Sequence, residues 1–453
     1  MAQLFSATTV FVTMKSAVKG NDSFEANLNC TVMRIDNVYQ HDGVLDVTDF
    51  ARKIAEDYDA QNVNEPFSII DLDVVKGQLD LWKGALPSVK PYYAVKCNND
   101  LNILKTLSAN GVCFDCASAR EIELVQSNEL AAGDDIILAH PIKSRQCIEF
   151  AIANGITMMT FDSVEELRKI SSITKEAKLI LRIRVSGFES LVDLNKKFGA
   201  DDITSKLIFH EAAKMGVKIH GISFHMGSGV ENCRPLALSL TVARQVLDYG
   251  RLLGHPLDLL DIGGGFIATS KQAFLKIGNF IENILRTCFK GVALSVIAEP
   301  GRFFVTDAQY VVARVNQVVL KFTAEDLPAF HSIYLNDGVY GSFNFVLTEK
   351  RRVKGIPLRI REGHMRADIW GPTCCSFDII ENDRRLTTVK KGDWLLYPEC
   401  GAYSLCLSTN FNGFCPPKVL YITSSINWRN INQNTCRRKV EEDDSIGEIF
   451  SKL

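Results

Sequence analysis

Short apolar segments alternate with amphipathic segments in the middle of the chain, from about Pro91 to Arg302. The apolar segments are rich in β-branched and aromatic side chains, which is typical of buried strands. The eight segments are Tyr92–Val95, Val112–Asp115, Ile136–Ala139, Met158–Phe161, Leu179–Val185, Ile219–His225, Leu259–Ile262 and Leu294–Ala298. Eight strands separated by helices over about 210 residues predict an α/β fold with a closed (β/α)8 barrel. An open, doubly wound sheet is the alternative on pattern alone.

The pattern changes after residue 302. Segments such as AQYVVARVNQVVL, DWLLYPECGAYSL and PKVLYITSSI are separated by turn residues and show no helical period, which predicts an antiparallel β domain. Cys30–Ile35 is expected to add a strand to this domain, and Val47–Asp57 to form a helix that leads into the barrel. The predicted organisation is a flexible N-terminal tail (1–29), a segment partly joining the β domain (30–65), the barrel (66–302), the β-rich domain (303–432) and an acidic tail (433–453).

Composition narrows the class of partner. The chain has 453 residues, 46% hydrophobic and 23% charged, with a formal net charge of −2, which suits a soluble protein of two domains. Interspersed charges of both signs give no basic surface for nucleic acid or anionic membrane, and no apolar run is long enough for a transmembrane helix. Thirteen irregularly spaced cysteines indicate a reducing cytoplasm and no disulfide framework. A small-molecule partner and no metal are therefore expected.

Polar residues stand where the predicted barrel strands end. They are Lys96, Asp115, His140, Asp162, Arg182, His225, Gly263–Gly265, Glu299 and Arg302. In a (β/α)8 barrel these strand ends form one face, so residues distant in sequence converge on it. Any one of them could equally be a helix cap or a turn residue, but their repetition at eight strand ends predicts an active site.

Four segments carry recognisable chemistry: PYYAVKCN around Lys96, SFHMGSG around His225, DIGGGF from Asp261 and AEPGR around Glu299. Burial at a strand end would lower the pKa of Lys96 toward that of a nucleophilic amine, although a lysine reaching out into solvent is the alternative. Three consecutive glycines allow a backbone to approach a phosphate closely. Arg302 could add a charge-assisted contact to that phosphate. Glu299 could keep a pyridine nitrogen protonated, or form a structural ion pair.

These segments, in this order and spacing, resemble the eukaryotic ornithine decarboxylases, which have an alanine-racemase-like fold. The resemblance covers most of the chain. Further matching motifs are FDCAS (Phe114–Ser118), MMTFDS (Met158–Ser163), KFGA (Lys197–Ala200), NDGVYGSFN (Asn336–Asn344), WGPTC (Trp370–Cys374) and FNGF (Phe411–Phe414). The resemblance implies a barrel that binds pyridoxal 5′-phosphate, followed by the β domain.

Roles at matching positions also follow from the resemblance. Lys96 would form the Schiff base with the cofactor, Glu299 would contact the pyridine nitrogen, and His225 would stack on the ring. Phosphate contacts would come from Ser228, Gly263, Gly264, Gly265, Arg302 and Tyr403. Polar residues around the site and the subunit contact would be Asp115, Glu121, Arg182 and Lys197.

The resemblance implies a homodimer with shared active sites, to which the second subunit contributes a catalytic Cys374. Asp337, Cys375 and Phe411 would contact the substrate. The implied reaction is decarboxylation of L-ornithine to putrescine, an entry to polyamine synthesis. Cys375 departs from the family, which has a carboxylate there for the distal ammonium, so an uncharged substrate such as L-leucine remains an alternative. A second alternative is a non-catalytic protein like the antizyme inhibitors, and antizyme is a possible partner.

Overall fold

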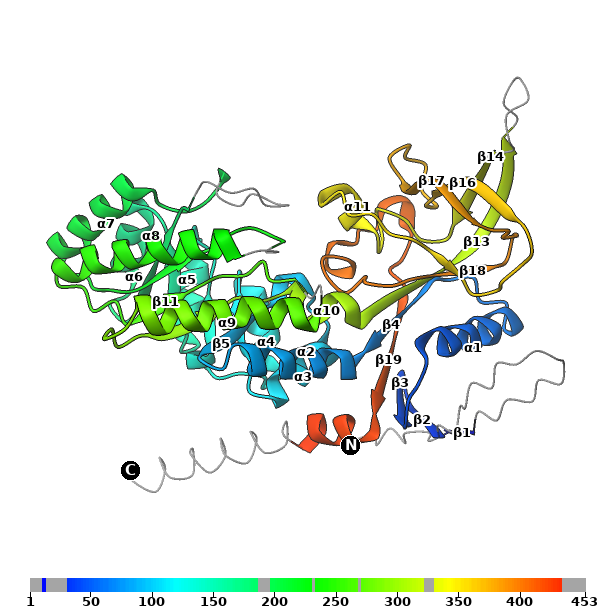
Figure 1. Ribbon diagram of the computed structural model, residues 1–453, viewed down its shortest axis with the longest axis horizontal. Coiled ribbons are helices and arrows are strands. Elements are labelled where there is room, and N and C mark those ends of the chain that lie inside the picture. Colours follow the sequence, from blue (N-terminus) through cyan, green and yellow to red (C-terminus); the bar gives the residue numbers. More distant parts are fainter. Residues whose placement is uncertain are drawn as a thin grey trace. The chain divides into compact units, whose positions relative to one another are not determined.

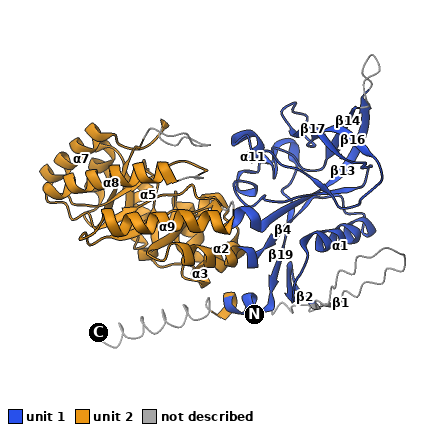
Figure 2. Cartoon of the chain, viewed as in Figure 1, with its two compact units in different colours: residues 1–74, 305–430 blue, residues 75–304, 431–453 orange. Residues whose placement is uncertain are grey.

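A computed structural model describes residues 10–13, 31–185, 196–229, 233–267, 270–321 and 330–433. The chain folds into two compact units, shown in Figure 2. The β-rich unit comprises Met1–Val74 and Val305–Asn430, and the barrel unit comprises Val75–Phe304 and Ile431–Leu453. Among the described residues, no helix is both long and apolar enough to cross a membrane.

The barrel unit contains a closed ring of eight parallel strands. They are β5 (Val89–Ala94), β6 (Cys113–Cys116), β7 (Ile136–Leu138), β8 (Met158–Phe161), β9 (Lys178–Ile183), β10 (Ile219–Phe224), β11 (Leu259–Asp261) and β12 (Ser295–Ala298). Each of the eight predicted segments forms one strand. Pairing of β12 with β5 closes the ring and excludes the open sheet. Apolar side chains from five strands fill its interior: Tyr92, Cys113, Ile137, Ile180 and Ile297.

Helices surround the barrel strands (Figure 1): α2 precedes the first strand, and one helix follows each strand of the ring. They are α2 (Leu72–Ala85), α3 (Leu101–Ala109), α4 (Ala119–Ser127), α5 (Arg145–Ala153), α6 (Val164–Ile173), α7 (Asp202–Lys214), α8 (Cys233–Leu252), α9 (Lys271–Cys288) and α10 (Arg302–Val305). Side-chain caps fix several of their starts close to the strand ends. Ser118 begins α4, Ser144 begins α5 and Ser163 begins α6, each accepting a hydrogen bond from a backbone N–H in the first turn.

The β-rich unit is built on an eleven-stranded sheet. Its strands are β1 (Val10–Thr13), β2 (Thr31–Ile35), β3 (Val38–Asp42), β4 (Phe67–Asp71), β13 (Gln309–Lys321), β14 (Phe330–Leu335), β15 (Ile356–Pro357), β16 (His364–Trp370), β17 (Ile379–Thr387), β18 (Trp394–Tyr397) and β19 (Lys418–Ser424). The predicted strand at Cys30–Ile35 is present as β2. The sheet is mixed rather than purely antiparallel, because β19 runs parallel to β3 and β4, and β14 runs parallel to β16.

Two predicted boundaries differ from the structure. The barrel was expected to begin at residue 66, but β4 pairs with β13 and β19 in the β-rich unit. A fully buried apolar strand looks the same in either setting, so the pattern could not assign it. Within the predicted N-terminal tail, β1 pairs with β2. The predicted acidic tail lies outside the described residues except for residue 433.

Helix α1 (Val47–Ala60) covers part of the β-rich sheet, and α11 (Asn344–Thr348) follows β14 in the chain. Asp46 caps α1 by accepting hydrogen bonds from two backbone N–H groups. The buried face of α1 carries Phe50 and Ile54, which pack with Trp394 of β18 in one apolar cluster. The predicted helix at Val47–Asp57 is therefore confirmed.

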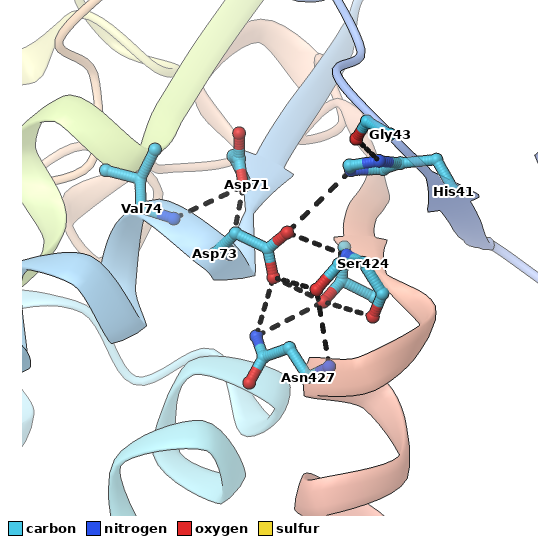
Figure 3. A network of polar contacts seen from close by, with 8 residues as sticks. His41, Gly43, Asp71, Asp73, Val74, Ser424 and Asn427 are labelled. Carbon is cyan, nitrogen blue, oxygen red and sulfur yellow. Dashed lines mark hydrogen bonds and ion pairs between the residues drawn. The ribbon is translucent and has the colours of Figure 1, made fainter. Parts of the chain in front are cut away.

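A polar network ties three segments of the β-rich unit together (Figure 3). The Asp73 carboxylate accepts hydrogen bonds from the backbone N–H of Ser424 at 2.7 Å and from Asn427 Nδ2 at 2.9 Å. His41 Nε2 lies 3.8 Å from the same carboxylate. Asp71 caps the start of α2, and burial, with the nearby charge of Asp73, raises its pKa to about 6. The network joins β3, the start of α2 and the end of β19.

Candidate active site

Lys96 lies at the carboxyl end of the barrel, in the 3-10 turn Val95–Cys97 that follows β5. Its Nζ forms an ion pair with Oδ2 of Asp115 on β6. The Asp115 side chain is fully buried, and its Oδ1 has no hydrogen-bond partner among the described residues. The Lys96 side chain is 41% exposed. The sequence suggested a desolvated amine, whereas the structure places a paired, accessible amine at the barrel mouth.

Two further carboxyl groups lie at neighbouring strand ends. Asp261 ends β11 and Glu299 follows β12. Burial raises the pKa of Asp261 to about 7, and it raises that of Glu299 well above its usual value, with the charge of Asp261 adding to the effect. The positive charges of Lys96 and Arg182 act in the opposite direction on Glu299. Glu299 can therefore retain a proton at neutral pH.

His225 follows β10 and faces the same cluster. Burial, together with the charges of Arg182 and Lys96, lowers the pKa of His225 well below its usual value. The imidazole is therefore neutral, and its Nδ1 accepts a hydrogen bond from the backbone N–H of Gly227 at 3.0 Å. Its proton is consequently on Nε2. A neutral ring of this kind can stack on an aromatic cofactor without adding a charge.

The glycine turn after β11 forms a tight backbone cradle. Gly263 has φ +67°, and a Cβ there would lie 2.1 Å from the carbonyl oxygen of Phe224. A Cβ on Gly264 would lie 2.4 Å from the Glu299 carbonyl oxygen, so only glycine fits. Gly265 also has a positive φ and accepts a hydrogen bond from the Gly229 N–H at 3.1 Å. The cradle therefore joins the loops after β10 and β11.

Two buried polar side chains near the cradle, Ser228 and Arg302, fit an anionic ligand. Ser228 Oγ is buried and has no hydrogen-bond partner among the described residues. Arg302 is buried at the start of α10, just after β12. A hydroxyl, exposed backbone N–H groups and a guanidinium are the donors that bind phosphate. The residues present therefore fit a phosphorylated cofactor.

The other predicted residues of the barrel unit make contacts that fix the loops around the barrel mouth. Glu121 on α4 accepts a hydrogen bond from the Ala117 N–H at 2.6 Å, which fixes the turn after β6. Burial raises the pKa of Glu121. The ring of Phe198 lies 5.4 Å from the guanidinium of Arg182 and 4.9 Å from the ammonium of Lys197. Two further strand-end residues hold the same segment: Asp162 accepts the Gly199 N–H, and the His140 ring contacts Phe198.

Five predicted residues lie in the β-rich unit, not in the barrel unit. Asp337 follows β14, Cys374 and Cys375 lie between β16 and β17, and Phe411 begins a 3-10 turn (Phe411–Gly413). Asp337 and Phe411 line one small pocket. Tyr403, the predicted phosphate contact, is also in this unit and has φ +55°.

Asp337 is held tightly by its own loop. Its side chain is buried, and Oδ1 accepts hydrogen bonds from the N–H groups of Gly338 at 2.8 Å and Ser342 at 3.1 Å. Oδ2 has no hydrogen-bond partner among the described residues. Burial raises the pKa of Asp337 to about 6, against the effect of these hydrogen bonds. One of the two Asp337 oxygens is therefore hydrogen-bonded within its own loop.

Cys375 has a neutral partner. Its Sγ is 2.9 Å from the hydroxyl of Tyr340, whose ring stacks on Phe411 with centroids 4.8 Å apart. Cys374 is exposed, and its backbone N–H donates to Asn412 Oδ1 at 2.9 Å. The Cys375 thiol therefore has a polar but uncharged hydroxyl as its partner.

Sequence reasoning missed the roles of Asp261, Tyr340 and Asp378. Asp261 stands at a predicted strand end, which was a usable signal. Asp378 is buried and accepts hydrogen bonds from the Thr373 N–H, the Thr373 hydroxyl and the Val339 N–H. Nothing in the local sequence distinguishes Asp378 from a surface carboxylate, because the loop of Val339, 39 residues away, packs against it only in the folded chain.

The fold and the mouth together fit one class, the (β/α)8-barrel proteins that bind a phosphorylated cofactor. Residues 72–306 match the family described as "Pyridoxal-dependent decarboxylase, pyridoxal binding domain". The ornithine decarboxylase of Caenorhabditis elegans is 38% identical over 402 residues, which cover 86% of this chain and 95% of the relative. The chain belongs to the pyridoxal-dependent decarboxylase family that includes the ornithine decarboxylases.

Solved structures agree with this assignment. The arginine decarboxylase of Paramecium bursaria Chlorella virus, bound to agmatine, superposes with a TM-score of 0.76 at 31% identity, covering 82% of this chain and all of that one. The lysine/ornithine decarboxylase of Vibrio vulnificus, complexed with cadaverine, gives a TM-score of 0.74 at 29% identity, covering 84% and 98%. The chain is a pyridoxal-dependent decarboxylase, and its cofactor is pyridoxal 5′-phosphate.

Proposed function

We propose that this protein decarboxylates L-ornithine to putrescine, with pyridoxal 5′-phosphate held at the carboxyl end of the barrel. The observation that supports this most strongly is the cluster at the barrel mouth, where Lys96, His225 and Glu299 meet a glycine cradle. A protein that only binds a partner has no physical need for such a cluster. The cluster therefore argues against a non-catalytic relative of the antizyme inhibitors.

Each residue of the mouth has a distinct task in this proposal. Lys96 Nζ would hold the cofactor covalently, and the glycine turn, Ser228, Arg302 and Tyr403 would hold its phosphate. When bound, the cofactor supplies an electron sink for the electron pair left as carbon dioxide departs. The Glu299 carboxylate would accept a hydrogen bond from the protonated ring nitrogen and so keep the proton on that nitrogen. His225, whose pKa is lowered by burial, would present a neutral face to the ring.

A second subunit would complete the site. Cys374 and Phe411 are exposed on the β-rich unit, whereas Lys96 and Glu299 belong to the barrel unit. We propose a homodimer in which Cys374 of one subunit serves the barrel of the other and directs the proton that returns to the substrate Cα. The cytoplasm is the expected location, and antizyme is a possible further partner.

Mixing two inactive variants tests the shared site. Lys96→Ala and Cys374→Ala homodimers each lack one half of both sites. A mixed dimer has one site with both residues and one with neither, so random exchange should restore about a quarter of wild-type activity. No recovery after demonstrated subunit exchange would contradict the shared site.

A second substrate class is favoured by one observation. The Cys375 thiol and the Tyr340 hydroxyl contact each other at 2.9 Å, and Asp337 has only one oxygen not bound by its own loop. An ammonium in a desolvated pocket requires a paired charge. An un-ionised thiol, in contrast, behaves as a small apolar group. Decarboxylation of an uncharged amino acid such as L-leucine is therefore the second candidate.

Release of carbon dioxide from a panel of amino acids distinguishes these possibilities. Purified protein loaded with pyridoxal 5′-phosphate is incubated with ornithine, lysine, arginine and leucine, and the amine product is identified by mass spectrometry. We expect one amine for each carbon dioxide released. Absence of release from every amino acid, despite bound cofactor, would support a non-catalytic protein.

A further inference from the structure

Cys374 and Cys375 form the one pair of adjacent cysteines in the sequence. They lie in the loop between β16 and β17 of the β-rich unit. Both are free thiols; Cys374 is exposed and Cys375 is partly exposed. Two accessible thiols on neighbouring residues can bind one thiophilic atom together, which a single cysteine cannot do.

The loop that carries the two thiols is held in place by polar contacts. The backbone N–H of Cys374 donates to Asn412 Oδ1 at 2.9 Å, and that of Cys375 donates to Thr373 Oγ1 at 3.4 Å. Thr373 is fixed in turn by Asp378, whose Oδ2 accepts both its N–H and its hydroxyl. A loop with fixed backbone loses less conformational entropy when both sulfurs engage one ligand.

Tyr340 supports a negatively charged or metal-bound sulfur. Its hydroxyl lies 2.9 Å from Cys375 Sγ. This hydrogen bond is the main cause of a raised pKa of Tyr340, so the phenol remains protonated at neutral pH and can donate to the sulfur. Donation to a thiolate is a charge-assisted hydrogen bond, which is stronger than one to a neutral thiol.

The geometry favours a bridging atom over a direct disulfide. Cα atoms of adjacent residues are about 3.8 Å apart across a trans peptide, below the usual range of about 4.4–6.8 Å for a disulfide. An inserted atom that bonds to both sulfurs relieves this constraint. Among the described residues, no group of three or more His, Cys, Asp or Glu could hold a metal ion. The ligand must therefore bring its own remaining substituent.

We propose that Cys374 and Cys375 form a chelating site for monosubstituted trivalent arsenicals. With an arsonous acid, R–As(OH)2, two As–O bonds break and two As–S bonds form. The two thiol protons leave with the two hydroxides as two water molecules, and no oxidant or reductant is needed. This site does not depend on the proposed reaction, because its occupancy is measured as binding.

Phenylarsine oxide is the probe for the test. The full-length protein is titrated with it, and adducts are counted by intact mass while free thiols are counted spectrophotometrically. We expect one phenylarsenic group per chain at low equivalents, with loss of two thiols. A dithiol such as 2,3-dimercaptopropanol should remove the group, whereas a monothiol at the same thiol concentration should not.

Single substitutions locate the chelate. Cys374→Ser and Cys375→Ser should each weaken binding by at least about 100-fold, because the second sulfur contributes through its high effective concentration. Cys415→Ser is the matched control, since Cys415 is exposed and lines the neighbouring pocket. It should bind like wild type. Circular dichroism and thermal unfolding check that each variant is folded.

Two outcomes would overturn the proposal. Tight binding that survives Cys375→Ser, or that is lost in Cys415→Ser, would assign the chelate to another pair. Loss of only one thiol per bound phenylarsenic group would also exclude chelation. Tyr340→Phe should slow binding several-fold while the stoichiometry stays at one.

Discussion

The barrel mouth and the cysteine loop of the β-rich unit control their side chains in different ways. At the mouth, ionisable groups from several strand ends are buried together, so that the pKa values of Asp261 and Glu299 rise and that of His225 falls. In the β-rich unit, backbone N–H groups instead bind Asp378, which lies in the cysteine loop (371–378, between β16 and β17), and one oxygen of Asp337, which lies in the loop after β14. The barrel therefore gathers ionisable groups whose pKa values are shifted, while the surroundings of Cys375 in the loop provide shape and polarity.

This difference has a functional consequence. Residues at barrel strand ends are positioned by the closed ring of strands, so their chemistry is common to every substrate. Residues of the cysteine loop are positioned by hydrogen bonds to Val339, Tyr340 and Asn412 within the β-rich unit, so they can change without disturbing the barrel. Substitutions at the mouth, or of the proposed catalytic Cys374, should therefore affect all substrates equally, whereas substitutions of Cys375 should change substrate preference.

The largest expected effect is that of Lys96→Ala. Because Lys96 is proposed to hold the cofactor covalently, its loss should lower kcat by at least about 1,000-fold. Carbon dioxide release measures this loss, and borohydride reduction of the wild-type protein should fix the cofactor on Lys96. Lys90→Ala is the control, because Lys90 begins the same strand and makes an exposed ion pair with Asp135. Label on another lysine would refute the assignment.

A smaller effect is expected for Glu299→Gln. A neutral amide cannot keep the ring nitrogen protonated, so kcat should fall on the order of 100-fold while the cofactor remains bound. Cofactor absorbance and turnover are measured on the same samples. Glu282→Gln, at a surface hydrogen bond to Ser88, should leave both unchanged. Equal loss of cofactor and turnover in Glu299→Gln would indicate a structural role.

Cys375→Asp should change the preference of the enzyme between ornithine and leucine. A carboxylate added beside a distal ammonium contributes about 2–5 kcal/mol in a desolvated pocket, so kcat/KM for ornithine should rise by at least about tenfold. For leucine, kcat/KM should fall. Cys288→Asp adds a charge at an exposed cysteine elsewhere and serves as the control. Efficient ornithine turnover by the wild type, unchanged in Cys375→Asp, would show that the ammonium is paired in another way.

The smallest expected effect is the pH dependence of the free energy of unfolding. The pKa of Asp261 is about 7 in the folded protein, against an ordinary 3.8. Between these two pH values the folded state binds a proton that the unfolded state has lost. The contribution of Asp261 to the free energy of unfolding is therefore fully present below about pH 4 and is lost as the pH rises to about 7. The slope is less than about 1.4 kcal/mol per pH unit.

Urea unfolding of the cofactor-free protein across this range measures that slope. Asp261→Asn removes the titrating group and should flatten the dependence between pH 4 and 7. An identical pH dependence in wild type and Asp261→Asn would mean that the Asp261 carboxyl is ionised throughout. Asp337 is present in both proteins, so its own titration cancels in the comparison.

The sequence predicts the barrel well and the cysteine loop poorly, for a physical reason. Parallel strands buried on both faces appear as continuous apolar runs, and their ends are marked by polar residues such as Lys96 and Glu299. The contact between Cys375 and Tyr340 spans 35 residues and depends on how two loops meet. The assignment of β4 to the β-rich sheet depends on pairing with β13 and β19, which local pattern does not encode.

One measurement tests most directly whether the barrel mouth controls the rate for every substrate while Cys375 controls the choice of substrate. It compares kcat/KM for ornithine and for leucine in wild type, Glu299→Gln and Cys375→Asp. Glu299→Gln should lower both values by the same factor and leave their ratio unchanged, whereas Cys375→Asp should shift the ratio toward ornithine by at least about tenfold. A ratio altered by Glu299→Gln, or unaltered by Cys375→Asp, would contradict the account.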